Sequence, residues 1–137
     1  MYKRVLILAT AFLLALSAAP NTSKMPPDAS ALIDRVRRAA EQSDWTALRS
    51  SMLREFTWSF GGDRDADQAI QEWKNRPEQV RELSQVLRAG CHVDSARYGD
   101  GKNASRIKCD GKGGTHFRAG LINTAEGWKL EYFVGGD

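Results

Sequence analysis

Apart from a short alternating segment at 55–60, the hydrophobic period of the chain changes near residue 90 from that of helices to that of strands, and this change constrains the fold more than any other feature. Before residue 90, apolar residues recur at the three- and four-residue spacing of amphipathic helices. After it, they alternate with polar residues, as in strands with one buried face. Helices first and a strand meander afterwards predict an α+β domain, in which the helices pack on one face of a curved antiparallel sheet.

Capping and breaking residues set the expected helix ends. Ser43 and Asp44 separate the first two helices, which form an expected α-hairpin. Asp63 or Asp65 caps the third helix, and Pro77 suits the first turn of the fourth. The expected helices cover 28–42, 45–54, a segment around Ala66 to Trp73, and 77 up to Gly90.

Period-two alternation predicts five strands, one of which lies among the helices. That strand, 55–60, places Phe56, Trp58 and Phe60 on one face. The last strand shows the same alternation, with Lys129 and Glu131 opposite an apolar face. That apolar face is expected to carry Trp128, Leu130, Tyr132 and Val134. The other expected strands are 91–98, 104–109, 115–122 and 128–134, joined by turns at 99–101, 110–114 and 125–127.

The first twenty residues have the layout of a secretory signal peptide. Lys3 and Arg4 precede an apolar run over 5–16, and small residues follow at 17–19. The run is shorter than the ~20 residues that span a bilayer. We therefore expect 1–19 to be a removed signal and the protein to be periplasmic or secreted, with no stable membrane anchor; an uncleaved anchor is the competing interpretation. A disordered lead-in over 20–27 and a single α+β domain over 28–137 complete the expected organisation.

Charge argues against a general nucleic-acid binder. The whole chain carries 20 Lys and Arg against 17 Asp and Glu, a net +3. Without Lys3 and Arg4, 18 basic residues stand against 17 acidic ones, a net +1. A nucleic-acid-binding domain needs a clustered basic surface, which a nearly neutral composition does not indicate.

Cys91 and Cys109 are the two cysteines, and an even count in an exported chain favours a disulfide. Both fall in expected neighbouring strands. A redox or nucleophilic thiol is the alternative, but the C-x-x-C spacing of an oxidoreductase is missing. A metal site is disfavoured because Cys91 and His92 are adjacent and no finger-like ligand spacing occurs.

The order of elements, together with the segments AEQSDWTALRSSMLREFTWSF and EGWKLEYF, resembles the NTF2-like, or SnoaL-like, superfamily. The resemblance covers about residues 29–134. It implies a cystatin-like cone, formed by a curved sheet and its helices, with an open mouth. Some members of the superfamily catalyse there with an Asp–His pair or an Asp base, and many only bind. The helix break at Pro77 and the cysteine pair depart from the family's layout.

Carried over to this chain, the cone would offer His92, Asp94 and His116 as catalytic candidates. His92 and Asp94 alternate onto one face of a strand, so both side chains can reach one space. A general base needs a pKa near the working pH and a hydrogen-bonded partner, and the sequence shows neither. Isolated strand histidines more often have a structural role or are exposed.

Tryptophans are frequent for a domain of this size. Each of the four falls on an apolar stripe, which indicates core. The alternative is that some of these tryptophans line the opening of a ligand-binding site or a partner surface, where aromatic side chains concentrate binding energy. Trp45, Trp58 and Trp128 are the candidates for that binding role.

These patterns together favour an exported, non-enzymatic binding or protein-interaction domain. One alternative is a small lyase, isomerase or hydrolase that uses an Asp–His pair in the cone. Another is an inhibitor or immunity protein of the cell envelope. The expected partner is a small molecule or an envelope protein rather than nucleic acid, and no cofactor or metal is expected.

Overall fold

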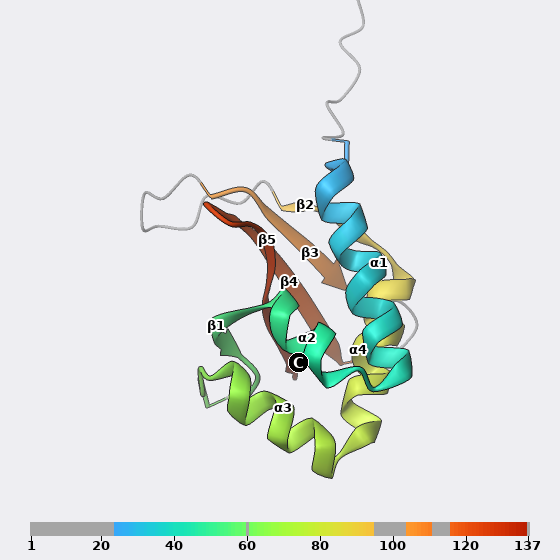
Figure 1. Cartoon of the computed structure of the whole chain (residues 1–137). Coiled ribbons are helices and arrows are strands. Elements are labelled where there is room, and N and C mark those ends of the chain that lie inside the picture. The colour runs from blue at the N-terminus through green and yellow to red at the C-terminus, as the bar shows by residue number, and fades with distance from the viewer. Residues whose placement is uncertain (1–23, 60, 95–103, 111–115, 137) are drawn as a thin grey trace, which may run out of the picture.

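The computed structural model describes residues 24–59, 61–94, 104–110 and 116–136 of the chain (Figure 1). The expected signal peptide over 1–19, Phe60 and the expected turn at 99–101 lie outside the described residues. The elements, in chain order, are α1 (Pro27–Gln42), α2 (Trp45–Ser51), β1 (Met52–Thr57), α3 (Ala66–Asn75), α4 (Pro77–Ala89), β2 (Cys91–Asp94), β3 (Arg106–Asp110), β4 (Phe117–Thr124) and β5 (Gly127–Gly135).

The first two helices are divided as the sequence predicts. Ser43 ends α1 in the left-handed conformation, with φ at 53°, and its N–H donates to the carbonyls at the end of the helix. Asp44 caps α2, because its carboxylate accepts from the Ala47 N–H at 3.0 Å. However, α2 ends at Ser51, because the chain is already paired in β1 from Met52 onward.

The third and fourth helices also begin where capping chemistry places them. Asp65, not Asp63, caps α3, and its carboxylate accepts from the Gln68 N–H at 2.9 Å. Pro77 is the first residue of α4, where its missing N–H leaves no hydrogen bond unmade. Gly90 ends α4 with φ at 123°, a conformation that favours glycine.

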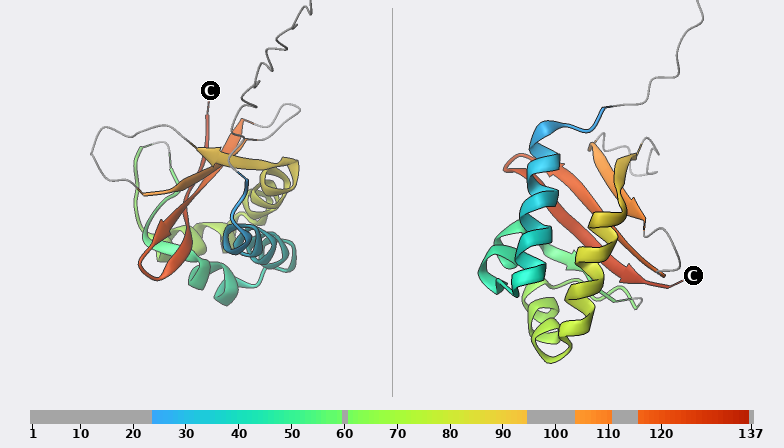
Figure 2. Two further views of the ribbon diagram at one scale, coloured as in Figure 1. Left: turned by 90° about the horizontal axis from the view of Figure 1, so that it is seen from above. Right: turned by 90° about the vertical axis from the view of Figure 1, so that its right-hand side faces the viewer.

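The five described strands form one sheet in the order β1-β5-β4-β3-β2. The meander from β2 to β5 is antiparallel, as predicted, but β1 pairs with β5 in parallel. The sheet is therefore mixed at one edge. Helices α1 and α4 lie side by side across one face of it, and α3 packs beside β1 (Figure 2). This arrangement confirms the predicted α+β class.

A β-bulge in β5 overturns one sequence expectation. Gly120 pairs with Tyr132, whereas the next residue of β4, Leu121, pairs with Leu130. Glu131 is thus the extra residue, and it reverses the alternation of the strand after it. Phe133 is buried, while Tyr132 and Val134 leave the face of Trp128 and Leu130. The prediction that all four alternate residues share one face was wrong.

The first strand is also shifted from the prediction. It begins at Met52 and ends at Thr57, so Met52 and Phe56, rather than Trp58, are its fully buried side chains. Trp58 lies beyond the strand, half-buried against the core. Its indole N–H is buried and has no acceptor among the described residues.

Helices and sheet enclose a filled hydrophobic interior. Trp73 of α3 is 1% exposed and meets the Phe56 ring edge-on, with 5.7 Å between ring centroids. Leucines and valines from α1 and α4 close the space over β3, β4 and β5. The largest fully buried side chains are Trp73, Phe56, Leu32, Leu48, Leu83, Ile107, Leu121 and Leu130.

The two cysteines form the predicted disulfide. Cys91 in β2 and Cys109 in β3 are register partners, with Cα atoms 4.1 Å apart. Both belong to the face of the sheet that the helices cover. The bond therefore ties the edge strand β2 to the core, since Cys109 is fully buried.

Candidate functional site

The sheet has two faces of different chemistry. Ile107 and Cys109 point toward the helices and are buried, so the alternate residues Arg106 and Lys108 project from the opposite side. We call this opposite side, which α1 and α4 do not cover, the outer face.

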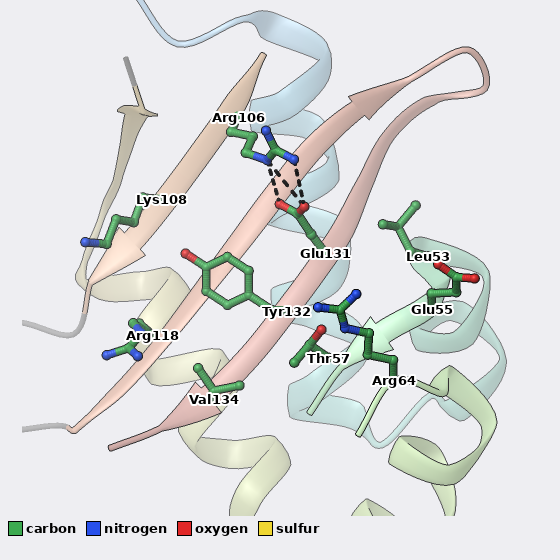
Figure 3. Close-up of a pocket in the computed structure, with 10 residues that line it drawn as sticks. All are labelled: Leu53, Glu55, Thr57, Arg64, Arg106, Lys108, Arg118, Glu131, Tyr132 and Val134. Atoms are coloured by element: carbon green, nitrogen blue, oxygen red, sulfur yellow. Dashed lines mark hydrogen bonds and ion pairs between the residues drawn. The ribbon is translucent and has the colours of Figure 1, made fainter. Parts of the chain in front are cut away.

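The outer face carries an open groove of about 600 Å³ (Figure 3). Strands β1, β3, β4 and β5 line it, together with Arg64, which forms an isolated antiparallel bridge with Thr57 at the end of β1. We call it the outer groove. Its lining residues are Leu53, Glu55, Thr57, Arg64, Arg106, Lys108, Arg118, Glu131, Tyr132 and Val134.

Tyr132 forms the floor of the outer groove by lying over Gly120. A Cβ atom at Gly120 would stand 2.1 Å from Cε1 of the Tyr132 ring, so only glycine leaves room for the ring there. One row of register partners crosses all five strands at this level. The row runs Thr57, Tyr132, Gly120, Lys108, His92.

An ion pair forms one end of the outer groove. Arg106 Nε lies 3.2 Å from Glu131 Oε2, and Arg106 Nη2 lies 3.3 Å from Oε1 (Figure 3). The two side chains are only 17% and 23% exposed. Glu131 is the bulge residue of β5, and its carboxylate reaches Arg106 of β3 across β4.

The groove carries an excess of positive charge. Its four cationic side chains outnumber its two carboxylates, and Glu131 is already paired with Arg106. Lys108 Nζ also lies 3.6 Å from a carboxylate oxygen of Asp110, an exposed and therefore weak pair. Arg64, Lys108 and Arg118 reach the groove from different elements. Such a set can hold an anionic group, because guanidinium and ammonium groups donate several charge-assisted hydrogen bonds.

A second groove, of about 450 Å³, adjoins the first where β1 meets the β4–β5 hairpin. We call it the hairpin groove. Lys129 Nζ donates to the Ser50 carbonyl at 2.9 Å, and Arg49 Nε donates to Asp67 Oδ1 at 2.6 Å. This hydrogen bond from Arg49 holds the pKa of Asp67 below its usual value. The hairpin groove is lined by Arg49, Ser50, Met52, Leu53, Arg54, Thr124, Ala125, Glu126 and Lys129.

The structure places the predicted acid–base residues outside the helix-covered interior. His92 and Asp94 are the register partners of Lys108 and Arg106, so they share one face of β2, as the alternation indicates, and that face is the outer one. His116 is exposed just before β4, and its carbonyl accepts from the Gly136 N–H at 2.9 Å. The three residues are therefore not gathered between the helices and the sheet, where the resemblance would place a catalytic pair.

The predicted binding tryptophans do not line the outer groove. Trp128 is 9% exposed and belongs to the core, and Trp45 packs partly buried against it. Trp58 lines a separate, shallow acidic pocket with residues of α3. The aromatic side chain of the outer groove is Tyr132, which sequence reasoning assigned to the core.

Sequence reasoning also missed the cations of the groove. A signal for two of them was present, because Arg106 and Lys108 alternate with Ile107 and Cys109 along β3. No local signal joins them to Arg118 or to Arg64, which the sheet and the β1 bridge bring into the same space.

Among the residues that the structure describes, no group of three His, Cys, Asp or Glu side chains is arranged to hold a metal ion. Within the same described ranges, no helix is long and apolar enough to cross a membrane.

Comparisons with known proteins bear on the fold alone. No family model and no curated protein sequence matches the chain. An NTF2-like protein of unknown function from Shewanella oneidensis aligns with TM-score 0.45 and 12% identity, over 80% of this chain and 97% of that one. A ketosteroid isomerase candidate from Shewanella frigidimarina aligns with TM-score 0.44 and 15% identity, over 85% and 98%. A protein of unknown function with a cystatin-like fold from Nostoc punctiforme aligns with TM-score 0.43 and 11% identity, over 79% and 86%. The first of these is named NTF2-like, and the third is named for its cystatin-like fold.

Proposed function

We propose that this protein is an exported, non-enzymatic binding domain that holds an anionic group of its ligand in the outer groove. The observation that carries the proposal is that three cations line one groove, with Arg64 on one side of the Tyr132 ring and Lys108 and Arg118 on the other (Figure 3). These cations come from segments that are distant in sequence, and the fold brings them to one side of the sheet.

The chemistry of the lining favours binding over catalysis. Arginine and lysine side chains keep their protons at neutral pH and act as donors, not as proton acceptors. A general base needs a carboxylate or imidazole directed at the bound substrate. Of the two carboxylates of the groove, Glu131 is engaged with Arg106, and Glu55 is exposed on the edge strand β1. His92 lies at the far end of the row, on the edge strand β2. The disulfide supports an exported location, because such bonds persist in oxidising compartments.

The affinity for a single small anion should be modest. An exposed ion pair contributes on the order of 0.2–1 kcal/mol, so three cations acting together give weak to moderate binding. Tyr132 adds an apolar surface whose position is fixed by Gly120. Tight binding therefore requires a ligand that contacts the ring as well as the cations.

An NMR titration with inorganic phosphate and with succinate tests the proposal. Backbone amide shifts should concentrate on β3, β4 and β5 next to the outer groove. Replacing Lys108 and Arg118 together by Glu should weaken the apparent affinity by about tenfold or more, since two attractive charges become repulsive.

The matched control reverses two exposed arginines on the helices. Arg38 on α1 and Arg81 on α4 lie on the opposite side of the molecule from the outer groove. The Arg38→Glu, Arg81→Glu variant has the same net charge as the groove variant and should bind both anions like the wild type. Equal weakening in both variants, or shifts spread evenly over the surface, would contradict the proposal.

A further inference from the structure

We infer that the partner of the outer groove is an extended segment of another protein, in which acidic residues are interspersed with apolar ones. This inference rests on the proposed function and names the class of ligand that the site takes. Three features of the surface support it: the adjacency of the two grooves, their openness and their mixed charge.

The outer groove and the hairpin groove share Leu53 of β1 as a lining residue. Together they define a track along the outer face of the sheet. The track runs from Glu126 and Lys129 at the β4–β5 hairpin, past Leu53, to Arg118 and Val134 at the other end of the sheet. A small ion fills only part of such a track, whereas an extended chain can follow its whole length.

The openness of the track also favours a chain over a small molecule. Small-molecule sites are concave and enclose most of the ligand in apolar walls. Here the walls include the exposed side chains of Arg54, Glu55 and Arg64, and the outer face is uncovered by α1 and α4. A segment laid along the sheet can use this surface without being enclosed.

The mixture of charges distinguishes a polypeptide from a uniform polyanion. Glu55, Glu126 and Glu131 stand among the cations of the track. A nucleic acid or a sulfated glycan carries negative charge at every repeat, so part of it must meet these carboxylates and be repelled. A polypeptide can place acidic side chains on Lys108 and Arg118 and a polar or basic one beside Glu55.

Apolar positions along the track give such a segment further contacts. Leu53, Tyr132 and Val134 are half-buried and lie between the charged side chains (Figure 3). Side chains of an extended peptide alternate in direction, so acidic and apolar residues can meet cations and apolar patches in turn.

The excess positive charge of the outer groove orients the partner. Of the carboxylates at the pocket beside α3, Asp67 is paired with Arg49 and Glu72 with Arg76, so they do not offset this charge. Opposite charge on the partner steers its approach toward the track, with a rate that falls as salt is raised.

Selection from a displayed library of random peptides tests this inference. Peptides of about ten residues span about 33 Å when extended, which suits a track across a sheet. The purified protein is the bait, and the Lys108→Glu, Arg118→Glu variant serves for counter-selection. Enriched peptides should contain acidic residues interspersed with apolar ones. Their dissociation constants, measured by fluorescence anisotropy, should rise about tenfold or more in the groove variant and stay unchanged in Arg38→Glu, Arg81→Glu.

A second variant separates an extended partner from a small anion. Leu53→Ser removes the apolar contact that joins the two grooves, while it leaves every charged group in place. It should weaken the selected peptides by a larger factor than it weakens phosphate, which the cations of the groove hold. Circular dichroism of each variant establishes that it is folded before binding is compared.

Other outcomes would overturn the inference. Selected peptides without acidic enrichment, or selected peptides that bind the groove variant as tightly as the wild type, contradict it. The inference is also contradicted if heparin or duplex DNA displaces the peptides and binds more tightly than they do. Phosphate binding in the groove without any enriched peptide would leave the proposed function standing and refute the extended partner. If neither phosphate binding in the groove nor an enriched peptide is found, the proposed function and the extended partner are both refuted.

Discussion

Gly120 and Tyr132 are interlocked across β4 and β5, and this contact sets the floor of the outer groove. The Tyr132 ring occupies the space that any side chain at position 120 would need. We expect Gly120→Ala to destabilise the protein by about 1–3 kcal/mol, the usual cost of overpacking. Urea denaturation measures the loss.

A double-mutant cycle identifies the cause of that loss. In a Tyr132→Ala background the ring is absent, so Gly120→Ala should cost much less, and the coupling energy should be about 1 kcal/mol or more. Equal costs in the two backgrounds would mean that backbone conformation, rather than the ring, makes glycine necessary at this position.

At the scale of elements, helix α1 is tied to α4 by Glu41. The Ser84 hydroxyl donates to Glu41 Oε1 at 3.0 Å, and Arg37 and Arg88 pair with the same carboxylate. The Ser84 hydrogen bond, followed by the two guanidinium groups, holds the pKa of Glu41 below its ordinary value of 4.5. Because the folded pKa is lowered, the stabilisation is complete above pH 4.5 and is lost as pH falls through the folded value.

Replacing Glu41 by Gln should therefore make the free energy of unfolding depend less on pH on the acid side of neutrality. The variant should be less stable than the wild type at neutral pH, and the difference should shrink below about pH 4.5. Thermal unfolding across pH measures this. A constant difference at all pH values would contradict the linkage.

The disulfide holds the edge strand β2 against β3. Cys91 and Cys109 are 18 residues apart in sequence, so the bond closes a loop whose constraint on the unfolded chain contributes about 3 kcal/mol in the chain-entropy description. Cys91→Ser with Cys109→Ser should lower the free energy of unfolding by that order in urea denaturation. The reduced wild type should show a similar loss. A variant as stable as the oxidised protein would show that β2 is held by its strand pairing alone.

At the scale of the whole molecule, hydrophobic period and capping residues predict the architecture well, because both act locally. Asp44, Pro77 and Gly90 end or begin helices where their chemistry dictates. The cysteines could be paired because their expected strands are neighbours. The parallel pairing of β1 with β5 could not be predicted, since it joins residues far apart in sequence, such as Met52 and Leu130, which are 78 positions apart.

The site was less predictable than the fold, for a definite physical reason. A single bulge residue, Glu131, reverses the direction of every side chain after it, and the alternation of the sequence carries no mark of the bulge. Tyr132, which follows the bulge, was therefore assigned to the core. Glu131 was assigned to the face on which it lies, but nothing in the sequence indicated its pairing with Arg106. Trp58 was expected in the core of β1, but the strand ends one residue earlier, at Thr57.

The outer face of the sheet is the proposed binding surface, and fluorine NMR at Tyr132 tests this proposal most directly. Tyr2→Phe and Tyr98→Phe leave Tyr132 as the one tyrosine of the chain, which can then carry 3-fluorotyrosine. Titration with phosphate, or with a selected acidic peptide, should move the Tyr132 resonance in a saturable way. The shift should be abolished by Lys108→Glu with Arg118→Glu and retained in Arg38→Glu with Arg81→Glu. A Tyr132 resonance that stays unchanged while the ligand demonstrably binds would place the binding surface elsewhere and contradict the account.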